Sequence, residues 1–444
     1  MNASSFYGKT AAKLPPELSD DSDLDSSSDE EENHPIHGNE DMSITTESDE
    51  EDDRVQRPTA SSATTTQVPK RSPVWKVVSD KNGKSEPAWK DVPPHPSDVE
   101  SPISYFRKFI DADMLTNICD QTSLYSSQKN PNKVICLTQN ELEQFLGIVM
   151  TISINKLPQT RLYWSEQFRV PQIADVMRRD RWEFIKRSLH FNNNEHAPDA
   201  SDADRDKIYK IRPVVDHLVK KFQAIPKSQK LCVDEQLVPF KGRSSMKQYL
   251  PKKPKKWGYK IFMLCDAAGM VYNFEIYTGK ISPQPGMPDI GASGNIVLRM
   301  ADVVPWHKNY ILLFDNWFTS LDLEVALMKI GIHSVGTVRE ARLKGCKLPT
   351  DKDLKKSGRG AFEEREVTVD GINIRAVKWF DNRSVSLVST FASASPEHSV
   401  RRFDKKARSM VDVSCPSIVK IYNQSMGGVD LLDMLVALYR TTLR

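Results

Sequence analysis

The chain has 444 residues, and its 62 Lys and Arg against 59 Asp and Glu give a formal net charge of only +3. The longest strongly apolar run, residues 145–154, is about half the roughly 20 residues that a membrane-spanning helix needs, and no apolar segment typical of a secretory signal opens the chain. The six cysteines lie far apart without a C-x-x-C pair, which argues against a zinc site or a disulfide scaffold and favours an intracellular compartment.

The two charge signs are separated along the chain. Residues 1–53 hold 17 acids and two bases, whereas the remaining residues carry a net charge of +18. Residues 1–70 contain too few hydrophobic side chains to bury a core, so we expect a disordered acidic tail, for which a purely solvating role is an open alternative. The basic body favours a polyanionic partner such as nucleic acid.

Residues 71–102 contain Trp75 and Trp89 among prolines, and we expect an irregular linker packed on the body. Residues 103–230 are predicted to be helical, because apolar residues recur at helical spacing from Ile103 onward. Thr138 and Glu141 form a capping box before an apolar run. Pro213 indicates a boundary within the last helical stretch.

A basic helix is predicted over 176–191. Val176, Trp182, Ile185 and Leu189 share one face, and the bases on the other face are Arg178, Arg179, Arg181, Lys186 and Arg187. This basic face has two interpretations, a solvated surface or a surface that contacts phosphates.

From residue 231 the pattern changes to strands. Apolar runs predict strands at 231–240, 259–266, 270–279, 310–315 and 333–338, and a helix over 322–331 that ends at Gly331. This order predicts an α/β fold with a mixed sheet over 231–339.

Residues 340–413 alternate in strand fashion and turn at Asp370-Gly371 and Asp381-Asn382, which predicts a β-rich insertion. The last segment, 414–444, is predicted to form a helix that starts at Pro416 and is weakened or bent at Gly427-Gly428.

Three aspartates are candidates for metal-dependent chemistry. Asp234 lies inside a strand, Asp315 ends a buried strand, and Asp430 lies on the last helix with Asp433 three residues further on the same face. Carboxylates brought together repel one another unless a cation lies between them, and their oxygens suit Mg²⁺ or Mn²⁺. Isolated aspartates at strand ends are common, so spacing alone leaves a structural role open.

The segment between Glu235 and Asp266 contains no acid. Its bases are Lys241, Arg243, Lys247, Lys252, Lys253, Lys255, Lys256 and Lys260. Tyr249, Trp257 and Tyr259 are interleaved with them, a mixture that favours contact with DNA. A solvated loop or a nuclear localisation patch is the alternative.

Six blocks of the sequence resemble the piggyBac transposase family, in the order of that family. They are LTQNELEQFLGIVM (137–150), RRDRWEFIKRSLHFNNN (178–194), LCVDEQLVPFKGR (231–243), LLFDNWFTS (312–320), VGTVRE (335–340) and YNQSMGGVDLLDML (422–435). The likeness extends from about residue 100 to the end.

The resemblance implies an RNase H-like catalytic core whose three catalytic, metal-binding aspartates are Asp234, Asp315 and Asp430, with Asp433 in a supporting role. It implies two Mg²⁺ or Mn²⁺ ions, a nuclear protein that binds double-stranded DNA, and a helical region that helps dimerisation and DNA binding. The implied reaction is cut-and-paste transposition, in which water cuts each element end and the ends join into TTAA targets.

The sequence departs from this family at its end. Family members usually continue into a cysteine-rich zinc domain that recognises the element ends, and no such cysteines follow here. Two alternatives to an active transposase are therefore kept, a domesticated DNA-binding or chromatin protein without catalysis and a truncated, inactive fragment.

Overall fold

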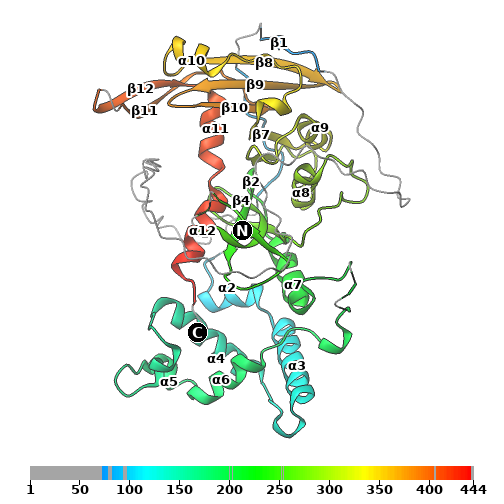
Figure 1. Cartoon of the computed structure of the whole chain (residues 1–444), viewed down its shortest axis with the longest axis vertical. Coiled ribbons are helices and arrows are strands. Elements are labelled where there is room, and N and C mark those ends of the chain that lie inside the picture. The colour runs from blue at the N-terminus through cyan, green and yellow to red at the C-terminus, as the bar shows by residue number, and fades with distance from the viewer. Residues whose placement is uncertain are drawn as a thin grey trace, which may run out of the picture.

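The structure is a computed structural model, and it describes residues 73–78, 83–93, 98–199, 201–202, 204–251, 253, 255–404 and 407–441. The acidic tail predicted over 1–70 lies outside the described residues. A ten-stranded mixed sheet forms the centre of the fold, and a separate group of helices lies at one end of the molecule (Figure 1).

The central strands of the sheet are those predicted after residue 230. They are β2 (Lys230–Pro239), β4 (Trp257–Asp266), β5 (Val271–Ile276), β6 (Ile311–Phe314) and β7 (His333–Thr337). β2 pairs antiparallel with β4 and parallel with β6, and β6 pairs parallel with β7. β5 and the short β3 (Lys247–Tyr249) both pair with β4, and the turn at 267–269 joins β4 to β5 as a hairpin.

Alternation along β2 and β6 divides the core between the two faces of the sheet. Val233 and Phe314 belong to a cluster that contains residues of α8 (Ala292–Ala301) and α9 (Leu321–Lys329). Cys232 and Leu313 face the other way, toward α11 (Ser417–Ser425) and α12 (Gly428–Leu438). Both faces are covered, as the nearly continuous apolar sequences of these strands require.

The segment 340–413 is rich in strands as predicted, but it does not form a sheet of its own throughout. β8 (Phe362–Val369), β9 (Ile372–Phe380) and β10 (Ser384–Ser389) extend the main sheet, because β10 pairs antiparallel with β7. Only β11 (His398–Asp404) and β12 (Ser409–Cys415) form a separate two-stranded ribbon. The short α10 (Asp351–Ser357) precedes β8.

The helical region has its own core. Its helices are α2 (Pro102–Phe109), α3 (Ala112–Lys129), α4 (Gln139–Ile154), α5 (Pro171–Ala174), α6 (Arg179–Ser188) and α7 (Arg212–Gln223). The Thr138 side chain accepts from the Glu141 backbone N–H, as the capping box predicts, and Pro213 lies in the first turn of α7. Asp111 caps α3 and separates it from α2, a break that periodicity alone does not reveal.

The linker before this region packs on the body, as expected. Trp89 makes an edge contact with Tyr310, and the indole of Trp75 donates to the Lys344 carbonyl. The two residues of β1 (Lys76–Val77) pair with β8 at the sheet edge. Among the helices of the described residues, none has the length and apolar character that crossing a membrane requires.

Candidate active site

Asp234 and Asp315 occupy adjacent positions on neighbouring parallel strands. Val233 is the register partner of Phe314, so each aspartate directly follows this pair at the carboxyl end of β6. Alternation turns both side chains toward the face that α11 and α12 cover. Each carboxylate accepts a backbone N–H locally, Asp234 from Glu235 and Asp315 from Trp317, both at 2.8 Å. The carboxyl ends of parallel strands are where open α/β sheets place their ligands.

The helix α12 brings two further acids over this face. Asp430 lies in its first turn, and Asp433 follows on the same side, where Gln236 of β2 hydrogen-bonds its carboxylate. Gly428 allows the close approach of the helix, because a Cβ at this position would lie 2.0 Å from the Asp266 carbonyl oxygen. The predicted weak point at Gly427-Gly428 is a break between α11 and α12, and it sets the direction in which Asp430 points.

Lys253 lies among these acids. Its Nζ is 3.4 Å from Asp430 Oδ1, and its side chain is 20% exposed whereas that of Asp430 is 73% exposed. Burial alone would lower the pKa of Lys253, but the charges of four acids raise it above its ordinary value; these acids are Asp234, Asp430, Glu235 and Asp433. The sequence predicted that Lys253 contacts DNA, and the structure instead directs its ammonium into the acid site.

Glu235 and Lys260 form the polar layer on the opposite face. The Lys260 ammonium lies over the rings of Trp317 at 4.3 Å and Phe262 at 4.9 Å, and the charge of Lys260 acts on Glu235. Lys260 is only 3% exposed. The prediction that Lys260 contacts DNA is therefore wrong, because alternation along β4 turns this lysine into the protein.

The site holds an excess of negative charge. Burial, followed by the charge of Glu235, raises the pKa of Asp234 well above its usual range, and Asp315 adds to the effect. Burial also raises the pKa of Glu235, although Lys260 and Lys253 oppose it. The pKa of Asp433 rises through burial against the hydrogen bond from Gln236. Crowded carboxyl groups of this kind favour binding of a cation.

The donors are of the kind that a hard divalent cation prefers, namely carboxylate oxygens from the middle of β2, from the residue after β6 and from α12. Among the described residues, no three His, Cys, Asp or Glu side chains are gathered closely enough to hold a metal ion. Asp234 and Asp315 lie side by side, whereas Asp430 is directed to Lys253. The fit thus depends on a shift of Asp430 away from that ammonium.

The loop after Asp315 is held by an arginine that the sequence did not single out. Nη1 of Arg342 donates to the carbonyls of Asn316, Trp317 and Thr319, at 3.2, 2.6 and 3.2 Å. These contacts fix the backbone that carries the carboxyl group of Asp315. Phe318 is fully buried, and Trp317 stacks on Phe262, so both pack beneath the site.

The predicted DNA-binding bases divide into several groups. Lys241, Arg243, Lys255, Lys256 and Arg178 are exposed, whereas Lys247 is half-buried. The Lys247 ammonium lies 5.0 Å from the Trp257 ring, and that ring packs on Tyr249. Arg179 pairs with the adjacent Asp180 at 2.9 Å. Lys252 lies outside the described residues.

Other bases of α6 are paired within the helical region. Arg181 forms a bidentate ion pair with Glu141. Lys186 and Arg187 both form ion pairs with Glu183. These pairs leave less free positive charge on this helix than its sequence indicates. Arg178 and the exposed bases after β2 remain available to a polyanion.

Asp266 has a structural role at the turn of the β4–β5 hairpin. It is 4% exposed, and its two oxygens accept from the hydroxyls of Ser228 and Tyr272 and from the backbone N–H groups of Ala268 and Met270. These four hydrogen bonds close the hairpin between β4 and β5 and occupy both carboxylate oxygens of Asp266.

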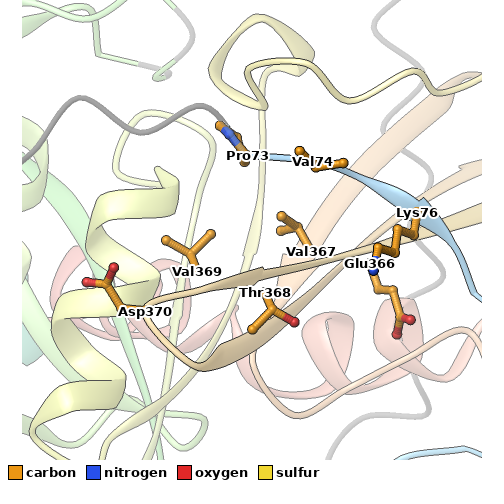
Figure 2. A pocket seen from close by; sticks show the side chains of 8 residues that line it. All are labelled: Pro73, Val74, Lys76, Glu366, Val367, Thr368, Val369 and Asp370. Atoms are coloured by element: carbon orange, nitrogen blue, oxygen red, sulfur yellow. The ribbon is translucent and has the colours of Figure 1, made fainter.

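A well-formed cavity lies elsewhere. It has a volume of about 450 Å³ and lies at the sheet edge where β1 meets β8 (Figure 2). Pro73, Val74 and Lys76 line it together with residues 366–370. Four strands, β9, β10, β7 and β6, separate β8 from β2 in the sheet, so this cavity is not part of the acid site.

Three members of the acid site escaped the sequence-based prediction: Glu235, Gln236 and Arg342. Glu235 directly follows Asp234 and was visible in the sequence, but its role depends on Lys260 across the strand pair. No sequence signal selects Lys253 from the other bases of its segment as the partner of the acids. Only the fold of the turn before β4 brings it there.

Comparisons with known proteins agree with this architecture. The sequence model of the family described as Transposase IS4 matches residues 101–444. The chain is 30% identical to human PiggyBac transposable element-derived protein 3, over 78% of this chain and 57% of that protein. It is 31% identical to human PiggyBac transposable element-derived protein 2, over 80% of this chain and 60% of that protein. The chain therefore spans less than two thirds of the length of these relatives.

A solved structure has the same overall arrangement. It is the piggyBac transposase synaptic complex with hairpin DNA, which matches with a TM-score of 0.61 and 25% identity over 78% of this chain and 70% of that one. The family match covers most of the chain, and the relatives and the solved structure agree with it. The chain belongs to the piggyBac transposase family.

Proposed function

We propose that this protein binds double-stranded DNA and performs divalent-metal-dependent DNA cleavage and strand transfer with Asp234, Asp315 and Asp430. The observation that carries the proposal is the placement of Asp234 beside Asp315 at the carboxyl end of β6, under a helix that carries Asp430 and Asp433. In this proposal the mixed sheet and its covering helices are an RNase H-like core.

The chain's own residues have distinct roles in this proposal. Asp234, Asp315 and Asp430 would hold Mg²⁺ or Mn²⁺, which would supply Lewis-acid activation of a water and stabilisation of the leaving oxygen. Gln236 orients Asp433, which supports Asp430 from the next turn of α12. Arg342 fixes the backbone after Asp315, so that this carboxylate stays next to Asp234.

The proposed DNA surface consists of the exposed bases near the acid site, namely Lys241, Arg243, Lys255 and Lys256, with Arg178 in the helical region. Lys and Arg bind DNA mainly through phosphates, so this surface sets affinity without sequence preference. The solved relative contains hairpin DNA, which supports a DNA substrate here. TTAA targets, a homodimer and a nuclear location are further parts of the proposal.

The test is nicking of a supercoiled plasmid that carries TTAA-flanked element ends, in Mg²⁺ and in Mn²⁺. Asp234→Asn and Asp315→Asn each remove one charged ligand, so we expect at least about a hundredfold loss of nicking with DNA binding retained. Asp120→Asn, an exposed position on α3, is the matched control. Nicking by the Asp234→Asn, Asp315→Asn double variant at the wild-type rate contradicts the proposal.

A second function is favoured by one observation. The ion pair between Lys253 and Asp430 places a protein cation where a metal ion is proposed, as suits a domesticated protein that binds DNA without cleaving it. The same assay separates the two functions. Tight DNA binding without metal-dependent nicking by the wild-type chain supports this second function.

A further inference from the structure

Lys253 joins acids that come from different elements. Its ammonium is 3.4 Å from Asp430 Oδ1 on α12, and the charges of Asp234 and Glu235 on β2 also act on it. The lysine is 20% exposed, so water screens these contacts less than it screens an open surface pair. Its position is thus that of a counter-ion for the acid site.

The backbone holds this lysine in a closed turn. The Lys253 N–H donates to the Leu250 carbonyl at 3.2 Å, and the Leu250 N–H donates to the Lys256 carbonyl at 2.8 Å. β3 and β4 flank the turn and pair with each other. Because these contacts hold Lys253 by its backbone, rotation of its flexible side chain moves the ammonium away from Asp430 without unfolding of the segment.

A lysine and a divalent cation compete for the same carboxylate oxygens here. Asp430 Oδ1 faces the ammonium at 3.4 Å, and a metal ion held by Asp430 would take up an oxygen of this same carboxylate. One ammonium also offsets only part of the negative charge of the site, which keeps the attraction for a doubly charged ion. The contact therefore weakens metal binding without preventing it.

We propose that Lys253 is an autoinhibitory counter-ion, which occupies the acid site in the absence of metal and must leave Asp430 before a divalent cation binds there. This inference rests on the proposed function, because it assumes that Asp234, Asp315 and Asp430 bind the metal. A DNA phosphate near the turn offers the released ammonium another partner. The metal site is then weak until the lysine is displaced.

The experiment measures binding of Mn²⁺ alone to the full chain without DNA, by electron paramagnetic resonance of the free ion. Lys253→Gln removes the competing charge and keeps a polar side chain of similar length. We expect it to bind Mn²⁺ roughly tenfold more tightly than the wild type. Lys255→Gln, an exposed neighbour in the same turn, makes the same charge change away from Asp430 and should alter the affinity less than about twofold.

Asp315→Asn in each background identifies the site, because it should abolish the Mn²⁺ binding that Lys253→Gln strengthens. Thermal unfolding provides a second measurement. Lys253→Gln leaves the acids without a counter-ion, so its melting temperature should fall without metal and rise more with Mn²⁺ than that of the wild type. This measurement also shows that the variant is folded.

The outcomes separate this inference from the proposed function. Mn²⁺ binding that Asp315→Asn abolishes, but that is equal in the wild type and in Lys253→Gln, overturns the role of Lys253 and leaves the proposed function intact. If neither the wild type nor Lys253→Gln binds Mn²⁺, or if Asp315→Asn leaves the binding unchanged, both the role of Lys253 and the proposed function are overturned. Tighter binding in Lys253→Gln and in Lys255→Gln alike also overturns the inference, because it then reflects total charge alone.

Discussion

Side-chain alternation along β2 assigns different roles to two consecutive acids. Asp234 points to the face that carries α12, whereas Glu235 points to the opposite face, toward Lys260 and Trp317. A shift of one residue in the register of β2 would exchange these two acids. The pairing of Val233 with Phe314 is therefore as important to the site as the aspartate itself.

Glu324 is a buried carboxyl group away from the acid site. It lies on α9, fully buried, and its Oε2 accepts from the Ser334 hydroxyl at 2.5 Å. Within the described part of the chain, its Oε1 has no hydrogen-bond partner. Burial raises its pKa to about 8, so the folded state favours the protonated form.

This raised pKa predicts a pH dependence of stability. The unfolded chain releases the Glu324 proton near the ordinary glutamate pKa, so the folded protein holds the extra proton between about pH 4.5 and 8 and loses stability as pH rises through this window, by up to about 1.4 kcal/mol per pH unit. Glu324→Gln removes the titration, and its free energy of unfolding should exceed that of the wild type at pH 8 but not at pH 5.

Urea unfolding at both pH values measures this difference. Glu195→Gln, at an exposed position, is the control and should follow the wild-type pH dependence. Parallel pH dependences for the wild type and Glu324→Gln contradict the assignment of the titration to this residue.

The sequence singles out the three aspartates, but not the residues that surround them in the fold. Asp234, Asp315 and Asp430 stand out because polar residues at the end of a buried strand or within a family motif are visible along the chain. Lys253 and Lys260 carry the same charge in the same segment, and the sequence predicted DNA contact for both. Alternation and a turn place them on opposite sides of β2, and both depend on strand pairing that the sequence does not specify.

At the scale of elements, the break between α11 and α12 determines the geometry of the third acid. Gly428 starts α12 close against β2 and β4. A Cβ at this position would lie 2.0 Å from the Asp266 carbonyl oxygen and 2.8 Å from Cys232 Sγ, so no side chain fits there. Gly427, one residue earlier, has open space around the position of a Cβ and an ordinary negative φ of −74°.

These two glycines form a matched pair for mutation. Gly428→Ala should destabilise the fold by about 1–3 kcal/mol and displace Asp430 from Lys253, because the backbone atoms it meets have no free space to move into. Gly427→Ala should be neutral or stabilise by up to about 1 kcal/mol. Chemical denaturation of both variants measures the difference, and equal stabilities would show that α12 is not held at Gly428.

Local sequence signals predicted single helices and turns well, but they predicted less well which strands pair with one another. The capping box at Thr138, the turn at Asp370-Gly371 and the helix end at Gly331 all appear as expected, because each depends on a few adjacent residues. The union of β8–β10 with the main sheet was not visible, since it depends on pairing between β10 and β7, some 50 residues apart along the chain.

At the scale of the molecule, the near-zero net charge conceals a net of −15 in residues 1–53 and +18 in the rest. Exposed bases follow β2, and Lys255 and Lys256 belong to the same turn as Lys253; an acidic segment of the same chain and a DNA backbone would both suit such bases. The tail is therefore a candidate competitor for DNA, although its residues lie outside the described part of the structure.

Deletion of residues 1–53 should raise the affinity for a random duplex about tenfold at low salt, and the gain should shrink as salt screens the charges. Fluorescence anisotropy with a labelled duplex at two salt concentrations measures it. A full-length variant with the acids of the tail changed to Asn and Gln separates charge from bulk. An unchanged affinity in both variants would limit the tail to a solubilising role.

The continuous ladder from β8 through β9, β10 and β7 to β6 has a mechanical consequence. Movement of these added strands as a rigid arm relative to Asp315 requires rupture of the hydrogen bonds between β10 and β7. The β11–β12 ribbon pairs with no strand of this ladder, but side chains tie it to the frame: Trp379 Nε1 donates to the Ser414 carbonyl at 2.8 Å, and Arg402 pairs with Asp381 at 3.3 Å. The sheet therefore acts as a stiff frame, and the ribbon is attached to it through side chains instead of a backbone ladder.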